Sequence, residues 1–231
     1  MMRKRYALLM ALGAFAAHPA SAVTFTETFE DGLNSGGWTY FSLNEQIEMS
    51  GGNPGRYLHA WMLDTFAPNP QTQGESIFTG DLRALQTTGI GVDLATFGVD
   101  FSAAERPLTL LLYSDNGTPA DFDDDWAAYT MGPDIPEPGQ GWIAYDFDVP
   151  AASLSLPPGW VTLALGPGSP AVMDWNALVT DVARTGFFYG DPTNFFIFQM
   201  WDVGLDNVRI GYEPAIAVER TSWGGVKRLF R

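Results

Sequence analysis

Short runs in which apolar and polar residues alternate, separated by glycine and proline, dominate this 231-residue sequence. In one such run, Ile143, Tyr145, Phe147 and Val149 alternate with alanine and aspartate. A period of two places every second side chain on the same face of a β-strand. The 25 glycines and 16 prolines mark turns between such strands. The pattern predicts an all-β fold: a single antiparallel jelly-roll β-sandwich with one short helix.

Other runs place further strands along the chain. Residues 108–113 are almost wholly apolar, which is typical of a strand covered on both faces. Two short runs, 92–94 and 97–101, flank Ala95 and Thr96, where we expect a β-bulge. The remaining predicted strands lie at residues 23–29, 160–165, 187–189, 195–201 and 206–212.

One segment departs from the two-residue period. Trp175, Leu178, Val179 and Val182 follow the i, i+3, i+4, i+7 spacing of an amphipathic helix, and Asp174 is a suitable N-cap. We therefore predict a short helix across one end of the sandwich, with Trp175 in the core.

The chain contains no cysteine, so disulfide bonds do not stabilise it. Burial must supply the stability, and 16 Phe, 8 Trp and 8 Tyr provide a large aromatic area for it. Residues 23–215 are long enough for one sandwich-sized domain.

The first 22 residues are typical of a secretory signal. Arg3, Lys4 and Arg5 precede an apolar run over residues 6–17, and Ala20-Ser21-Ala22 supplies small residues for cleavage after Ala22. The apolar run is shorter than the roughly 20 residues that a membrane-spanning helix needs. No later segment approaches that length. We therefore expect a secreted or periplasmic protein with no transmembrane segment after cleavage.

Charge is distributed unevenly between the domain and the C-terminal residues. Residues 1–22 carry three of the 12 Lys and Arg and none of the 27 Asp and Glu, so the net charge falls to −18 without them. Residues 23–215 contain five arginines, no lysine and 26 of the carboxylates. Such a surface repels nucleic acid and anionic membranes, so we expect neither as a partner.

Residues 216–231 form a basic, amphipathic tail. Trp223, Val226 and Phe230 share one helical face, while Arg220, Lys227, Arg228 and Arg231 supply positive charge. The tail is either a peptide that docks the protein to an envelope partner or a frayed terminus.

Both ends of the domain resemble galactose-binding-like jelly rolls of the carbohydrate-binding-module type. Residues 29–32 (Phe-Glu-Asp-Gly), followed by Gly37-Trp38, resemble the first strand of these modules, and residues 205–210 (Leu-Asp-Asn-Val-Arg-Ile) resemble the last. Laminin domain IV-like segments share the layout more loosely. The middle of the chain matches by its number of strands, and its loops resemble those of uncharacterised exported bacterial β-sandwich proteins. The resemblance implies a jelly roll and a glycan or cell-surface ligand.

In the modules that the chain resembles, an early acidic residue and a late aspartate hold a structural calcium ion. By position these residues are Glu30 and Asp206. Counting from Val208 and Ile210, Asp206 falls on the core-facing side of its strand, where a carboxylate needs a partner or a metal. The alternative is that Asp206 caps a turn.

A second acidic cluster lies in a predicted loop and consists of Asp115 together with Asp121, Asp123, Asp124 and Asp125. Adjacent carboxylates repel one another unless water or a cation screens them. The spacing departs from that of an EF-hand. The cluster is therefore either a solvated loop or a second calcium site.

Three aromatic residues are candidates for stacking on sugar rings: Trp61, Trp126 and Tyr129. The alternative for each is a place in the core.

The sequence favours binding over catalysis. His59 is the only histidine after residue 22, and it lies in a predicted strand between aromatic residues, so a Ser-His-Asp relay is not favoured. We predict a secreted, non-catalytic module that binds carbohydrate and is stabilised by calcium. A glycan hydrolase that uses two carboxylates is one alternative. A structural envelope protein docked through residues 216–231 is another.

Overall fold

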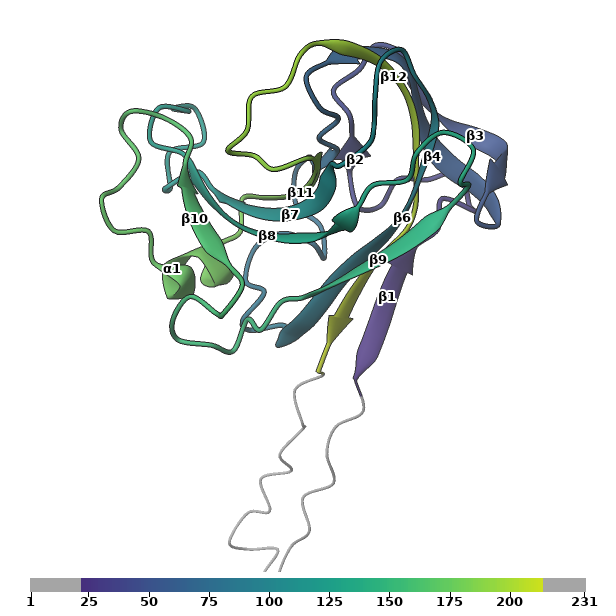
Figure 1. Cartoon of the computed structure of the whole chain (residues 1–231). Coiled ribbons are helices and arrows are strands. Elements are labelled where there is room, and N and C mark those ends of the chain that lie inside the picture. Colours follow the sequence, from purple (N-terminus) through teal and green to yellow (C-terminus); the bar gives the residue numbers. More distant parts are fainter. Residues whose placement is uncertain (1–21, 214–231) are drawn as a thin grey trace, which may run out of the picture.

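The computed structural model describes residues 22–213, which form two stacked antiparallel sheets (Figure 1). The first sheet has the order β3-β4-β12-β6-β9, and β1 also pairs with β12. Its strands are β1 (Val23–Glu27), β3 (Glu45–Gly52), β4 (Gly55–Thr65), β6 (Thr87–Val99), β9 (Ile143–Asp148) and β12 (Gln199–Tyr212). The long strand β12 pairs with β4 over its first half and with β1 over its second half.

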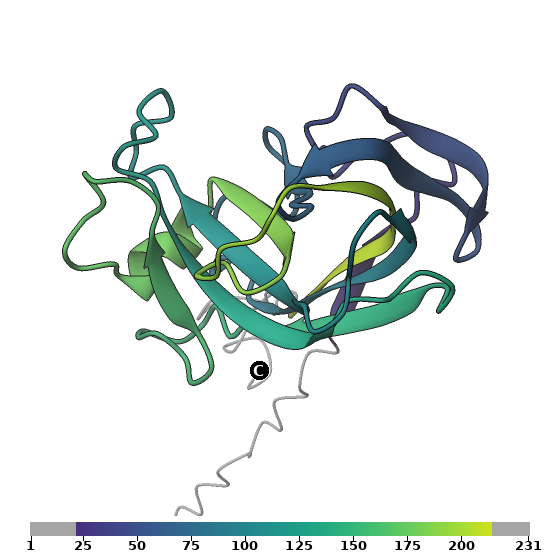
Figure 2. The same cartoon turned by 45° about the horizontal axis from the view of Figure 1, so that its top comes forward.

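The second sheet has the order β10-β8-β7-β11-β5-β2. Its strands are β2 (Trp38–Thr39), β5 (Gln71–Thr72), β7 (Pro107–Ser114), β8 (Trp126–Asp134), β10 (Val161–Ala164) and β11 (Arg184–Tyr189). The β3–β4 hairpin and β10 with the helix lie at opposite ends of the molecule (Figure 2). The predicted all-β antiparallel sandwich with one short helix is confirmed.

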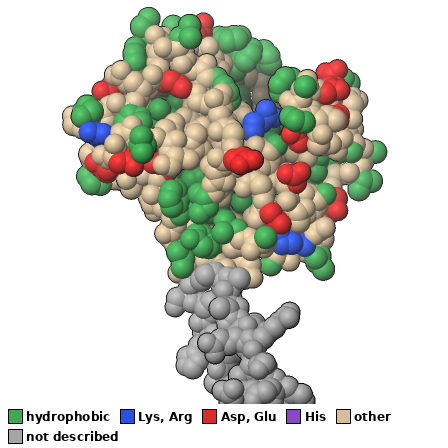
Figure 3. All heavy atoms as spheres, turned by 180° about the vertical axis from the view of Figure 1, so that it is seen from behind, with side chains coloured by type: hydrophobic (Ala, Val, Ile, Leu, Met, Phe, Trp, Pro, Cys, Tyr) green, Lys and Arg blue, Asp and Glu red, His purple; other side chains and the backbone are tan. Residues whose placement is uncertain are grey.

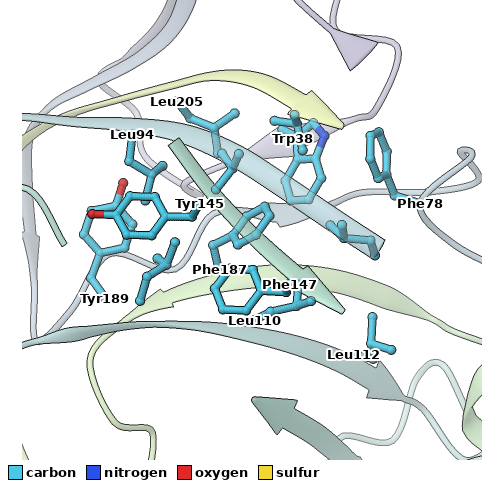
Figure 4. Packing of buried hydrophobic residues seen from close by; sticks show 14 of the residues in the cluster. Trp38, Phe78, Leu94, Leu110, Leu112, Tyr145, Phe147, Phe187, Tyr189 and Leu205 are labelled. Carbon is cyan, nitrogen blue, oxygen red and sulfur yellow. The ribbon is translucent and has the colours of Figure 1, made fainter. Parts of the chain in front are cut away.

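Aromatic side chains from both sheets fill the space between them (Figure 4). Trp38 stacks on Phe187 with ring centroids 5.4 Å apart and meets Phe78 edge-on at 5.2 Å. Tyr40 and Tyr189, both buried, share a hydroxyl–hydroxyl hydrogen bond of 3.1 Å. A buried pair of stacked or edge-on rings adds about 0.5–1.5 kcal/mol to stability, beyond the free energy gained by removing its surface from water.

Several predicted strands occur as the alternation indicated. In β9, Tyr145 and Phe147 are buried, while Ala144, Asp146 and Asp148 are exposed. Strand β7 is buried on both faces, because its two sides belong to different hydrophobic clusters.

Two predicted strands differ in detail. Residues 195–198 lie outside the strands, and β12 begins only at Gln199. The predicted runs 92–94 and 97–101 belong to one strand up to Val99, and the register shift against β12 falls between Thr96 and Gly98. Phe97 is therefore the extra residue of a bulge.

The predicted helix is present as α1 (Trp175–Thr180). Asp174 is its N-cap, because its side chain accepts a hydrogen bond from the backbone N–H of Asn176. Trp175 is buried in the core beside Trp160, with ring centroids 4.8 Å apart. The helix ends before Val182, which the spacing had included.

The two ends of the described chain lie side by side, because Val23 pairs with Tyr212 (Figure 1). The predicted signal peptide, apart from Ala22, and the basic tail at 216–231 lie outside the described residues. Docking through the tail therefore stays a prediction. Among the helices of residues 22–213, we find none with the length and hydrophobicity to cross a bilayer.

We predict that Trp38→Ala destabilises the protein by about 3–5 kcal/mol, because it leaves a cavity between Phe187 and Phe78. Chemical denaturation followed by circular dichroism measures the change. Trp38→Phe is the matched variant: it keeps a six-membered ring in the cavity, and the part of the indole that it removes includes an N–H with no hydrogen-bond partner, so it should cost less. Equal losses in the two variants would contradict a role in packing.

Candidate functional site

The outer side of the first sheet, away from the core, carries a group of aromatic residues. Strand alternation directs Leu58 and Ala60 of β4 inward, and both are buried in the core. Tyr57, His59 and Trp61 lie between and beside them, so they point outward.

Two more aromatic residues complete this group. Phe97 joins it from the bulge in β6, and Trp142 joins it from the loop before β9. The indole N–H of Trp142 donates to the backbone carbonyl of Gly51 in β3, at 2.9 Å. Neighbouring ring centroids are 5.2–5.9 Å apart. We call Tyr57, His59, Trp61, Phe97 and Trp142 the aromatic face.

A glycine lies beneath three of these rings. A Cβ atom at Gly204 would lie 2.7 Å from Trp142, 2.9 Å from Phe97 and 3.0 Å from Tyr57. Real Cβ atoms do not approach other atoms so closely, so the rings occupy the space that a side chain would take. The aromatic face therefore depends on glycine at this position of β12.

Two carboxylates hold the imidazole of His59 from opposite sides. Its Nδ1 lies 3.0 Å from Oε1 of Glu48, and its Nε2 lies 2.6 Å from Oδ1 of Asp202. Hydrogen bonds from Gln46 and then His59 lower the pKa of Glu48. Burial, reinforced by the charges of Glu48 and Asp202, raises the pKa of Tyr57 to about 12. The Tyr57 hydroxyl therefore stays protonated near neutral pH.

This arrangement suits a ligand with both apolar and hydroxyl-bearing surfaces. Phe97 is 42% exposed, Trp61 and Trp142 are half-buried, and Glu48 and Asp202 also reach solvent. Rings offer apolar contact, and carboxylates accept hydrogen bonds from hydroxyls. Both hydrogen-bond partners of His59 in the described structure are carboxylates. Among the described residues, no serine hydroxyl is hydrogen-bonded to the imidazole, as a Ser-His-Asp relay would need.

Of the three predicted stacking residues, only Trp61 lies on the aromatic face. Trp126 is 3% exposed and belongs to the core. Tyr129 is 5% exposed on the outer side of the second sheet, where it packs with Leu111 and Tyr113. Neither Trp126 nor Tyr129 presents an open ring face.

The sequence-based predictions did not include Tyr57, Phe97 or Trp142 as site residues. The alternation of Tyr57, His59 and Trp61 was a usable signal, because it places all three on one side of a strand. Phe97 and Trp142 come from distant segments, and only the sheet order brings them to β4.

Glu30 and Asp206 lie along the turn between β3 and β4. Asp206 is fully buried, and its Oδ2 accepts a hydrogen bond of 2.6 Å from the backbone N–H of Asn53. Glu30 accepts a hydrogen bond of 3.0 Å from the backbone N–H of Arg56. A Cβ at Gly52 would lie 2.8 Å from Asp206, and one at Gly55 would overlap the carboxylate of Glu30. Two glycines thus make room for two carboxylates.

The alternation counted back from Val208 predicted that Asp206 lies on the core-facing side of β12, and this prediction is wrong. Asp206 pairs with Asp93, next to the core pair Leu205 and Leu94, and the register shifts between Asp206 and Arg209. This bulge breaks the parity counted back from Val208, so Asp206 faces the β3–β4 turn. Burial, together with the charges of Asp93 and Glu30, raises the pKa of Asp206 to about 6.

Three of the four aspartates predicted as metal ligands in the β7–β8 loop have side-chain partners within the protein. Asp125 is buried and pairs with Arg184 at 2.8 Å. Asp124 accepts hydrogen bonds from Thr118 and Asn116. Asp121 accepts a hydrogen bond from the backbone N–H of Asp123.

Within residues 22–213, no three His, Cys, Asp or Glu side chains converge as a ready-made set of metal ligands. A calcium ion in the β7–β8 loop stays a prediction.

A shallow pocket of about 680 Å³ lies beside the end of α1. Glu75, Asp115 and Asp181 contribute carboxylates to its lining, which includes no aromatic side chain. A sugar ring would find no stacking surface in this pocket, so the aromatic face is the stronger candidate site.

No family model matches the sequence, and no curated protein matches it. Solved structures do match. One is an exo-beta-agarase, with 14% identity, a TM-score of 0.45 and 83% of this chain covered. Another is the Family 11 carbohydrate-binding module from Clostridium thermocellum, in complex with a beta-1,3-1,4-mixed-linked tetrasaccharide. It matches with 13% identity, a TM-score of 0.39 and 82% of this chain covered. The L4b domain of human laminin alpha-2 also matches, with 8% identity, a TM-score of 0.37 and 83% of this chain covered.

The match spans 25% of the agarase chain, 87% of the carbohydrate-binding module and 97% of the laminin domain. A carbohydrate-binding module and a laminin domain are the two kinds of domain that the sequence resembled. These likenesses are of fold alone.

We predict that Gly204→Val displaces Trp142 and breaks its hydrogen bond to Gly51, because the added side chain needs the space that the ring fills. The indole N–H resonance of Trp142 should shift or broaden in NMR spectra. Gly98→Ala is the control, since a Cβ there meets Asp202 only at an ordinary 3.6 Å. An unchanged resonance in Gly204→Val would contradict this packing.

Proposed function

We propose that the protein is an exported, non-catalytic carbohydrate-binding module, and that the aromatic face holds the sugar rings. The observation that carries the proposal is the group of partly exposed rings beside two carboxylates on one side of the first sheet. Sugars combine apolar C–H faces with hydroxyl donors, and this surface offers a complement to each.

The rings are held in place before any ligand binds. Trp142 is tied to Gly51, and His59 is fixed between Glu48 and Asp202. A pre-organised surface loses little side-chain entropy on binding, which favours affinity. Export rests on the signal-like residues 1–22, and it would bring the module to polysaccharides in the periplasm or outside the cell.

We expect Trp142→Ala and Trp61→Ala each to weaken polysaccharide binding about tenfold or more, because central aromatic side chains dominate such surfaces. Affinity electrophoresis against a panel of soluble polysaccharides measures the loss. Phe122→Ala, which removes a ring that is 66% exposed on the β7–β8 loop, should bind like the parent protein. Failure of the parent protein to bind any polysaccharide would refute the proposal.

A glycan hydrolase remains the alternative, and one feature favours it: Glu48 and Asp202 form a carboxylate pair at the aromatic face, separated by an imidazole ring. Retaining and inverting hydrolases both use two carboxyl groups. If the protein released reducing ends from a bound polysaccharide, and Glu48→Gln lost this activity, the protein would be a hydrolase and not a non-catalytic binding module.

We also propose that calcium stabilises the fold at the β3–β4 turn. Glu30 and Asp206 would hold the ion, and carbonyl oxygens of the turn would complete the hard oxygen ligands that calcium prefers. Support comes from the space that Gly52 and Gly55 leave for the two carboxylates, and from the pKa of Asp206, which burial and, to a smaller extent, repulsion from Asp93 and Glu30 raise. A divalent cation would relieve that repulsion.

Calcium in the millimolar range should raise the melting temperature of the protein relative to a chelator, because an ion bound only by the folded state stabilises it. Differential scanning calorimetry measures the shift. Asp206→Asn should abolish the part of the shift that this site contributes, whereas Asp64→Asn, at an exposed position of β4 outside both candidate calcium sites, should keep it. A melting temperature that does not respond to calcium would remove the ion from the proposal.

A further inference from the structure

We infer that the glycan bound at the aromatic face is uncharged, and that polysaccharides carrying sulfate or carboxylate groups are rejected. This inference rests on the proposed function and names the ligand class of the same site. The observation behind it is the charge of the aromatic face: among the described residues, carboxylates lie beside the rings, and no arginine or lysine side chain contacts them.

The aromatic face is negatively charged in either protonation state of its histidine. Glu48 and Asp202 each contribute a carboxylate to the two sides of His59. With a neutral imidazole the three side chains sum to −2, and with an imidazolium to −1. Asp202 is 43% exposed, so its charge meets an incoming ligand directly. An anionic sugar would be repelled, because like charges at short range disfavour binding.

Residues 22–213 contain no lysine, and the contacts of their five arginine side chains lie outside the aromatic face. Arg209, which lies on the same sheet, binds Asp93 at 2.8 Å and Asp146 at 2.7 Å. Arg184 pairs with Asp125 in the second sheet.

The other three arginines form no ion pair in the described structure, and their guanidinium groups contact other parts of the protein. Arg83 donates to the carbonyls of Ala151 and Ser153. Arg106 donates to the carbonyl of Phe66 and lies over the ring of Phe196. Arg56 lies against Gly32. Figure 3 shows basic side chains only at separate points, among more widely spread acidic ones.

The same carboxylates are suited to neutral hydroxyls. Gln46 and His59 both contact Oε1 of Glu48, and His59 contacts Oδ1 of Asp202. This leaves the second oxygen of each carboxylate to accept a hydrogen bond from a sugar hydroxyl. Hydrogen bonds to charged acceptors are stronger than those between neutral groups. The two carboxylates that hold His59 are thus also suited to accept hydrogen bonds from an uncharged glycan.

The test compares each neutral polysaccharide that binds with the same polymer after chemical sulfation, by affinity electrophoresis at low salt. We expect the sulfated form to bind at least tenfold more weakly, and the difference to shrink at high salt, because salt screens repulsion. The double variant Glu48→Gln/Asp202→Asn should narrow the difference. Asp121→Asn/Asp123→Asn, which changes net charge equally on the β7–β8 loop, should not.

Two outcomes would overturn the inference, and they are distinguishable. Equal or tighter binding of the sulfated polymer, lost in Trp142→Ala, would show an anion-accepting site and leave the carbohydrate-binding function standing. Binding of neither form would remove the proposed function, and the inference with it.

Discussion

Strand β12 is hydrogen-bonded on both edges, to β6 on one side and to β4 and then β1 on the other, and both candidate sites depend on how it is paired. The register shift next to Val203 leaves Phe97 as an extra, unpaired residue of β6 opposite β12. The shift after Asp206 turns that carboxylate toward the β3–β4 turn. A regular pairing of β6 with β12 would have neither feature. Register shifts along the pairing of β12 with β6 thus shape both candidate sites of the first sheet.

The aromatic residues are divided between the two sides of the first sheet. Inside, rings such as Trp38 and Phe187 supply the stability that a chain without disulfides needs. Outside, rings of the same kinds stay partly exposed, because a glycine beneath them and carboxylates beside them hold them at the surface. The packed interior makes the sheet rigid, and a rigid sheet keeps the outer rings in position.

Local sequence patterns predicted the elements of this fold well. Alternation identified β9, the continuous apolar run identified β7, and the spacing after Asp174 identified α1, because each depends on neighbours in the chain. The site was harder to predict. Trp61 was found, but Trp126 lies in the core and Phe97 was missed, since exposure depends on which strands pair and where a register shifts. Parity failed for Asp206 for the same reason.

The distribution of tryptophans gives the protein an optical reporter of its own surface. Residues 22–213 contain seven tryptophans, of which five are buried: Trp38, Trp126, Trp160, Trp175 and Trp201. The other two, Trp61 and Trp142, are half-buried, and both belong to the aromatic face. Collisional quenchers dissolved in water reach indoles only where solvent does. Within this part of the chain, the quenchable fraction of the emission therefore comes mainly from the aromatic face, and any molecule covering that face would shield it.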